Sequence, residues 1–110
     1  MDITSSSAKL ELDGYGFLKN RLQWSKQVAE QMAQQDGLVL TTAHWEIIDF
    51  MQAYYEQYNH QPNARLFGQA IKKTLGADKG ASLYLLKLFP EGPLKYANKY
   101  AGLPIPPFCI

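Results

Sequence analysis

The sequence predicts a mainly α-helical protein with a short N-terminal hairpin and an extended C-terminal arm. Apolar residues recur at steps of three and four through most of the 110 residues, a spacing typical of helices that share a core. Glycines and prolines separate these stretches, and three prolines follow Gly102. Hydrophobic residues make up 46% of the chain and charged residues 19%, which favours one globular domain over a disordered chain.

The hairpin is expected within residues 1–18. Polar and apolar residues alternate over 9–13, which predicts a short strand, and three consecutive serines before it supply a turn. Gly14 and Gly16 then break the pattern. The helical core is expected over residues 24–101.

The first two helices of this core have clear start and stop signals. Ser25 is expected to cap a helix that ends at Gly37. The clearest helix of the chain starts at Thr41 or Thr42 and is predicted to form the centre of the core. Its apolar positions recur at helical spacing and are Trp45, Ile48, Met51, Tyr55 and Tyr58.

Three further helices are predicted towards the C-terminus. Asn63 can cap a third helix that Gly76 ends. A fourth helix is expected over residues 78–88. Pro93 suits the first position of a last short helix, which Gly102 closes.

Residues 102–110 form the predicted arm, because their prolines exclude a helix and favour an extended or polyproline-like chain. The arm carries Cys109, the only cysteine. At about 3.1 Å per residue the sulfur can stand on the order of 20 Å from the body. Cys109 is therefore predicted to be a thiol presented to a partner, the alternative being an incidental thiol near a chain end. One thiolate suffices to accept and donate a sulfur atom by exchange.

Other kinds of chemistry have weak support. His44 and His60 stand far apart without a neighbouring ligand cluster, which argues against a metal site. His44, in the first turn of a helix, is predicted to be a packing or capping group rather than a catalyst. The sequence has no Ser/His/Asp grouping, Walker loop or dinucleotide fingerprint, and no cofactor is expected.

The charge pattern restricts the possible partners. A formal net charge of +1 argues against a nucleic-acid footprint over the whole surface but leaves local phosphate contacts open. The C-terminal half is basic, which indicates either a solvated face or a docking surface that also favours the Cys109 thiolate. No signal peptide or membrane-spanning stretch is evident, so a cytoplasmic protein with a reduced thiol is expected.

Short motifs along the chain agree in order and spacing with one known family. They are Gly16-Phe17-Leu18, Trp24, His44-Trp45-Glu46, Lys79-Gly80, Ser82, Tyr84-Leu85, Leu88-Phe89-Pro90, Gly92-Pro93, Ala101-Gly102-Leu103-Pro104 and Cys109-Ile110. Through them the chain resembles the DsrC/TusE sulfur-relay family over nearly its full length. The resemblance implies a small orthogonal helical bundle with an N-terminal β-hairpin and a flexible C-terminal arm.

The resemblance also implies a role for the penultimate cysteine. Members similar to the sulfite-reductase partner DsrC carry a second cysteine about eleven residues earlier, where this chain has Asn98. This departure indicates a TusE-like role, in which Cys109 accepts a persulfide sulfur from a TusBCD-type complex and serves the thiouridylase that makes 2-thiouridine at the tRNA wobble position. Candidate docking residues keep the basic pattern of the family, although Gln69, Leu83 and Ile105 replace residues that are often basic. They are Arg65, Lys87, Lys95 and Lys99.

The leading hypothesis is thus a cytoplasmic sulfurtransferase that carries a persulfide without a cofactor, monomeric alone and bound to other proteins, and to tRNA, only during transfer. One alternative is a DsrC-like partner or regulator of a sulfite reductase or a related sulfur-metabolism complex that carries no sulfur. The other is a nucleic-acid-binding protein, against which the near-neutral charge weighs.

Overall fold

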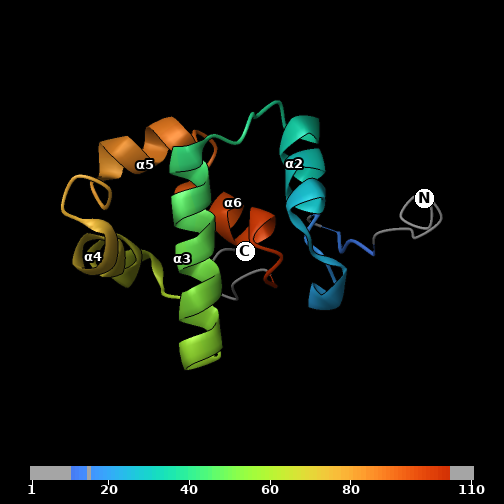
Figure 1. Ribbon diagram of the computed structural model, residues 1–110, viewed down its shortest axis with the longest axis horizontal. Helices are drawn as coiled ribbons and strands as arrows, with labels where there is room; N and C mark the ends of the chain where they lie inside the picture. The colour runs from blue at the N-terminus through green and yellow to red at the C-terminus, as the bar shows by residue number, and fades with distance from the viewer. Residues whose placement is uncertain (1–10, 15, 105–110) are drawn as a thin grey trace.

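The computed structural model describes residues 11–14 and 16–104, and it is mainly α-helical, as predicted. In Figure 1, α3 crosses the middle of the molecule, with α4 and α5 on one side and α2 on the other. The last helix, α6, packs against α2, α3 and α5. The elements in chain order are the 3-10 helix η1 (Arg21–Gln23) and the α-helices α2 (Lys26–Gln35), α3 (Thr42–Tyr58), α4 (Ala64–Leu75), α5 (Ser82–Leu88) and α6 (Pro93–Tyr100).

Helix α2 begins and ends where the sequence predicts. The side chain of Ser25 accepts a hydrogen bond from the backbone N–H of Val28 at 3.2 Å, which satisfies one free donor of the first turn. Gly37 follows the helix with a φ of +78°, the left-handed conformation that glycine adopts without strain. Between these ends, the helix buries a narrow apolar face formed by Ala29, Met32 and Ala33.

Helix α3 supplies the centre of the core. It starts after Thr41 and ends at Asn59, which adopts a left-handed conformation with a φ of +63°. Ile47, Ile48 and Met51 are completely buried on one side of the helix, at the spacing that brings residues to the same face. The prediction of this helix and its central place is confirmed.

The third and fifth predicted helices are also confirmed. The side chain of Asn63 accepts from the N–H of Leu66 at 2.9 Å and so caps α4, which ends at Gly76. Pro93 occupies the first turn of α6. Between them, α5 is shorter than predicted.

Helix α5 begins at Ser82 rather than Asp78, because the preceding residues form turns against α4. Gly80 is buried there, and a Cβ on it would come within 2.4 Å of the carbonyl oxygen of Gly68. This close backbone contact lies between segments that are distant in sequence. It fixes the path of the chain before α5, so the helix starts only after the turn.

The predicted N-terminal β-hairpin is not supported. Within the described residues, the pairing is one isolated antiparallel bridge between Leu12 and Leu18, and no strand is present. The backbone turns tightly at Gly16, which has a φ of +85°, and η1 follows soon after, so the paired segments stay too short for a ladder. The rest of the predicted strand and the serine turn lie outside the described residues.

The core gathers around α6. Tyr100 and Phe89 are among its largest buried side chains, and their rings lie 6.2 Å apart. Ala97 and Leu103 are completely buried beside them. Among the helices that the structure describes, none is both long and apolar enough to cross a membrane.

Candidate functional site

Cys109, the predicted nucleophile, lies outside the described residues, which end at Pro104. The structure therefore shows the base of the arm, residues 102–104, its junction with α6, and the groups that hold both. These groups, Trp24, Gln52 and Gln61, come from three separate parts of the chain.

Two side chains hold the junction between α6 and the arm. The indole Nε1–H of Trp24 donates to the carbonyl oxygen of Tyr100 at 2.7 Å. The amide Nε2 of Gln52, on α3, donates to the carbonyl oxygen of Ala101 at 2.9 Å. Both carbonyls belong to the last turn of a helix, where oxygens have no partner within the helix. The fold thus satisfies them from outside and fixes where the arm begins.

A third amide holds the end of this segment. Nε2 of Gln61 donates to the carbonyl oxygen of Pro104 at 2.6 Å, and the residue is only 6% exposed. Between the anchors, the side chain of Leu103 is completely buried in the core. The base of the arm is therefore part of the folded core.

Gly102 is the turning point of the base. Its N–H donates to the carbonyl oxygen of Lys99 at 3.2 Å and that of Leu103 donates to Asn98 O at 3.1 Å, the paired bonds of a Schellman motif. Gly102 has a φ of +74°, and a Cβ on it would lie 2.5 Å from Cδ1 of Trp24. Glycine is thus required both by the backbone conformation and by the indole packed against it.

Asn98 stands at the position where the family resemblance leads us to expect a second cysteine in DsrC-like members. Its side chain is completely buried, and Nδ2 donates to the carbonyl oxygen of Leu94 at 2.8 Å. Oδ1 has no hydrogen-bond partner within the described residues. An amide at this position cannot form a disulfide, so it offers no internal partner for a cysteine of the arm.

Lys99 is held within the fold. Its ammonium donates to Oδ2 of Asp36 at 2.8 Å, and the hydroxyl of Tyr100 donates to the same oxygen at 2.7 Å. Burial, together with this hydrogen bond, raises the pKa of Tyr100 above its usual value. The carboxylate therefore connects the end of α2 to the end of α6.

The other predicted docking residues occupy different surfaces. Arg65 is exposed on α4, in a groove of about 410 Å³ between α4, α5 and the start of α6, together with Lys72. Lys87 is exposed on α5, and the ammonium of Lys95 on α6 lies 5.5 Å from the ring centre of Tyr96. Neither Lys87 nor Lys95 lines the groove that contains Arg65.

Another lysine of the basic half is paired. The ammonium of Lys79 donates to both carboxylate oxygens of Glu46, at 2.6 and 2.7 Å. This hydrogen bonding raises the pKa of Lys79. The pair ties the turn before α5 to α3.

The ring nitrogens of both histidines contact backbone atoms of the fold. Nδ1 of His44 accepts from the N–H of Thr41 at 3.0 Å, and its Nε2–H donates to the carbonyl oxygen of Leu88 at 2.6 Å. The prediction of a capping and packing role is therefore confirmed. Nδ1 of His60 lies 3.0 Å from the carbonyl oxygen of Gln61. In the part of the chain that the structure describes, no three His, Cys, Asp or Glu side chains are grouped to hold a metal.

Sequence reasoning missed the two glutamine anchors. Gln52 is a polar residue within an apolar helix, and Gln61 precedes a proline, but neither position belongs to a known motif. Their partners lie 49 and 43 residues away, a separation that no local pattern predicts. Trp24 is one of the motif residues, but its contact to α6 has no signal in the sequence.

Comparison with known proteins gives consistent matches. The family model for DsrC-like proteins matches residues 4–110. Sulfurtransferase TusE of Yersinia pseudotuberculosis is 44% identical over 101 residues, which cover 92% of this chain and 94% of the relative. A protein of Haemophilus influenzae described as a sulfurtransferase TusE homolog is 46% identical over 102 residues, covering 93% of this chain and 94% of the relative.

The solved structures agree with these matches. DsrC of Allochromatium vinosum superimposes with a TM-score of 0.85 at 46% identity, covering 94% of this chain and 92% of the other. The oxidized gamma-subunit of the dissimilatory sulfite reductase (DsrC) from Archaeoglobus fulgidus has a TM-score of 0.80 at 37% identity, with 94% of each chain covered. The fold, the arm base and these matches together show that the chain belongs to the DsrC-like protein family.

Proposed function

We propose that this protein is a sulfurtransferase that carries sulfur as a persulfide on Cys109. It accepts the sulfur from a TusBCD-type complex and passes it toward 2-thiolation of the tRNA wobble uridine. The similarity to sulfurtransferase TusE over more than nine-tenths of the chain is the observation that carries this proposal. The anchored arm base supports it, because Cys109 follows Pro104 by only five residues.

The transfer needs two displacements at sulfur. The thiolate of Cys109 attacks the terminal sulfur of the donor's cysteine persulfide, so that a new S–S bond forms and the donor's S–S bond breaks. The donor leaves as a thiolate. Transfer onward is the same reaction with the Cys109 persulfide as donor. No oxidant or reductant is consumed, because each step exchanges one S–S bond for another.

Asn98 supports a carrier with one thiol. If a cysteine stood there, it could displace the outer sulfur of a Cys109 persulfide and close a disulfide within the chain. The buried amide removes that reaction. The persulfide then persists until another molecule attacks it, as a relay between proteins requires.

Docking is assigned to the basic residues of the last three helices. Arg65, Lys87 and Lys95 would meet acidic surfaces of the donor or acceptor, and their charges would favour encounter between the proteins. Lys99 contributes differently, since its ammonium is bonded to Asp36 and holds α6 in place. A cytoplasmic location and a monomer between transfers complete the proposal.

A second function has support from one comparison. The Archaeoglobus fulgidus relative is a subunit of a dissimilatory sulfite reductase. A protein of this fold could bind or regulate such a complex without carrying sulfur. The similarity to relatives described as sulfurtransferase TusE favours the first function.

The deciding experiment measures sulfur on the intact protein. A cysteine desulfurase and the TusBCD-type complex are incubated with the full chain, and mass spectrometry follows the gain of one sulfur atom, with peptide mapping to Cys109. Cys109→Ser should gain none, while Asn98→Ser should gain sulfur like the wild type. Equal loading of Cys109→Ser would refute the proposal.

A further inference from the structure

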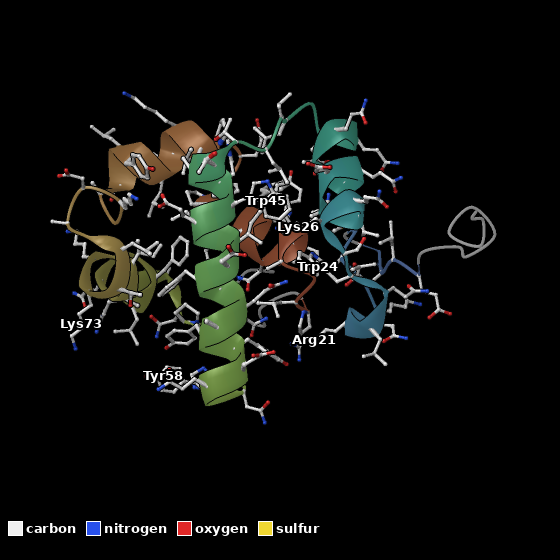
Figure 2. All side chains as sticks on the ribbon, in the orientation of Figure 1. Arg21, Trp24, Lys26, Trp45, Tyr58 and Lys73 are labelled. Atoms are coloured by element: carbon white, nitrogen blue, oxygen red, sulfur yellow. The ribbon has the colours of Figure 1, made fainter. Side chains whose placement is uncertain are left out.

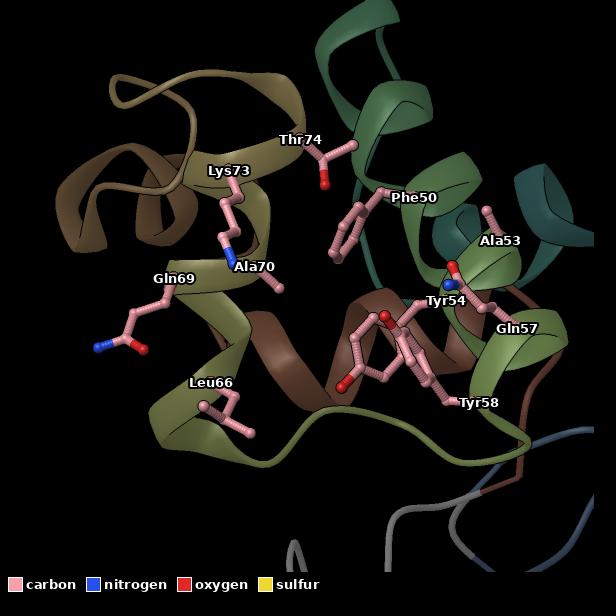
Figure 3. Close-up of a pocket in the computed structure, with 10 residues that line it drawn as sticks. All are labelled: Phe50, Ala53, Tyr54, Gln57, Tyr58, Leu66, Gln69, Ala70, Lys73 and Thr74. Atoms are coloured by element: carbon pink, nitrogen blue, oxygen red, sulfur yellow. The ribbon is translucent and has the colours of Figure 1, made fainter.

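A second candidate site lies between α3 and α4. There the structure has an open pocket of about 460 Å³, within the range of small-ligand sites. Figure 3 shows the rings of Phe50, Tyr54 and Tyr58 projecting from α3, with Leu66 and Lys73 on the facing helix. None of the residues proposed for sulfur transfer or docking lines this pocket.

The aromatic wall is accessible and pre-arranged. The rings of Tyr54 and Tyr58 lie 4.6 Å apart, and Tyr54 also contacts Phe50 at 6.0 Å. These contacts hold the ring of Tyr58, the outermost of the three, although it remains 49% exposed. An exposed aromatic ring held by its neighbours offers a face on which a planar group can stack at little entropic cost.

The charged side chains that line this pocket and the neighbouring groove are all positive. Lys73 lines the pocket, while Arg65 and Lys72 line the groove on the other side of α4. Neither lining contains an aspartate or glutamate, and α4 itself carries no acidic residue. Within the described residues, none of the three cations belongs to an ion pair. Helix α4 is thus a basic ridge, defined by Arg65, Lys72 and Lys73, that lacks anions.

The pocket also contains hydrogen-bonding groups. Gln57 lines it from α3, and an amide side chain both donates and accepts hydrogen bonds. Thr74 adds a hydroxyl from α4. Such groups can recognise the edge of a heterocyclic base, which presents donors and acceptors side by side.

We propose that this pocket binds an unpaired nucleotide of RNA. The base stacks on Tyr58 and its edge faces Gln57, while Lys73 binds the phosphate and the basic ridge contacts neighbouring phosphates of the strand. The inference goes beyond the proposed function, because it needs neither Cys109 nor a sulfur donor, although the ridge shares Arg65 with the proposed docking residues. It gives the protein a direct contact with RNA in spite of a net charge of only +1.

An acidic peptide with an aromatic residue is the main competing ligand. Such a peptide would use the same ridge and insert its ring against Tyr54 and Tyr58. Two features favour RNA. Stacking on an exposed ring beside an amide suits a base, and the cations along α4 suit a chain that has a phosphate at every unit.

The test is direct binding to the full chain. The probes are uridine, uridine 5′-monophosphate, a short oligouridylate and an acidic peptide that contains tyrosine. Binding is followed by backbone amide NMR shifts and by anisotropy of a labelled probe. Affinity should rise from uridine to the monophosphate and again to the oligouridylate, with shifts confined to α3 and α4. For three bound phosphates, the slope of log K against log salt should be about −2.

Variants assign the contacts. Tyr58→Ala should weaken oligouridylate binding about 5- to 150-fold, whereas Tyr58→Phe, which keeps the ring, should retain it. Lys73→Ala should reduce the size of the salt slope by about 0.7. Lys26→Ala is the charge-matched control, since Figure 2 places Lys26 on α2, away from the labelled Lys73 and Tyr58, and it should leave the slope unchanged.

Three results would overturn the proposal: no shifts in the pocket with oligouridylate, equal binding by Tyr58→Ala, or tighter binding of the acidic peptide. Circular dichroism confirms that each variant is folded. The outcome is separable from sulfur transfer, because Cys109→Ser should bind oligouridylate normally while failing to gain sulfur.

Discussion

Substitution of Gly102 tests whether the base of the arm is held by the core. Gly102→Ala places a methyl group where Cδ1, Cγ and Cβ of Trp24 would lie 2.5, 2.7 and 2.8 Å away. The left-handed backbone, with a φ of +74°, costs about 1–2 kcal/mol for a residue with a Cβ. Overpacking against the indole adds about 1–3 kcal/mol. We expect a total loss of about 2–5 kcal/mol, a large share of the roughly 5–15 kcal/mol typical of such domains.

Gly37 provides a matched control in the same chain. It occupies the same position of the same motif at the end of α2: its N–H donates to Gln34 O at 3.0 Å and that of Leu38 to Ala33 O at 2.8 Å. Its φ is +78°, but a methyl group added there would have no atom within 4 Å of it. Gly37→Ala should therefore lose only the backbone contribution, about 1–2 kcal/mol.

The assay is urea unfolding followed by tryptophan fluorescence, which gives the free energy of unfolding of each variant. Gly102→Ala should be at least about 1 kcal/mol less stable than Gly37→Ala, since only it overpacks Trp24. If the two variants lose equal stability, the contact between Gly102 and Trp24 does not constrain the fold and the reasoning fails. In the transfer assay, Gly102→Ala should also slow sulfur uptake from the donor complex, whereas Gly37→Ala should not.

Three further variants, one of them with a matched control, test other contacts. Tyr100→Phe should reduce the loss of unfolding free energy at alkaline pH. In the wild type the raised pKa keeps the native phenol protonated while the phenol of the unfolded chain ionises. The contribution of Tyr100 is therefore complete below about pH 10 and then falls by up to about 1.4 kcal/mol per pH unit. Equal slopes in urea titrations from about pH 9 to 11 would contradict this. Gly80→Ala should destabilise the protein by about 1–3 kcal/mol, because its Cβ would meet the carbonyl of Gly68, and Gly14→Ala, which has open space, should be neutral. Gln61→Ala should cost about 1–3 kcal/mol in thermal unfolding by removing the donor to Pro104, and a wild-type melting temperature would argue against an anchor there.

Local signals predicted most of the fold. Ser25, Asn63 and Pro93 start helices because caps and first-turn prolines act within three or four residues of themselves. Gly37 and Gly102 end helices because glycine takes the left-handed conformation without steric cost. Features of this kind are contained in the sequence itself.

The errors arise where distant residues meet. The predicted start of α5 is too early because the turn before it is fixed by Gly68, which belongs to another helix. The ion pair of Lys99 is likewise absent from local patterns, because Asp36, which holds its ammonium, lies 63 residues earlier; the docking role of Lys99 stays a prediction. Of the predicted strand, the described residues form one isolated bridge, between Leu12 and Leu18, and no ladder.

The candidate site also has features that the sequence shows and features that only the fold creates. A single cysteine beyond several prolines is visible in the sequence, and so is the substitution of Asn98 for a second cysteine. The anchors Gln52 and Gln61 are not visible, because an amide becomes an anchor only through the carbonyl that the fold brings to it. The helical spacing assigns Tyr58 to the core, whereas its place at the end of α3 leaves half of it exposed.

In the proposed sulfur transfer, the anchors set the direction of the arm more than its reach. Five residues separate Pro104 from Cys109 and can span at most about 18 Å. If the anchoring ended at Gly102, seven residues could span about 25 Å, and the accessible volume would rise only about threefold. Restricting the accessible volume by only about threefold would not require three side-chain hydrogen bonds and a buried Leu103. These contacts instead fix the side of the molecule from which the chain leaves after Pro104.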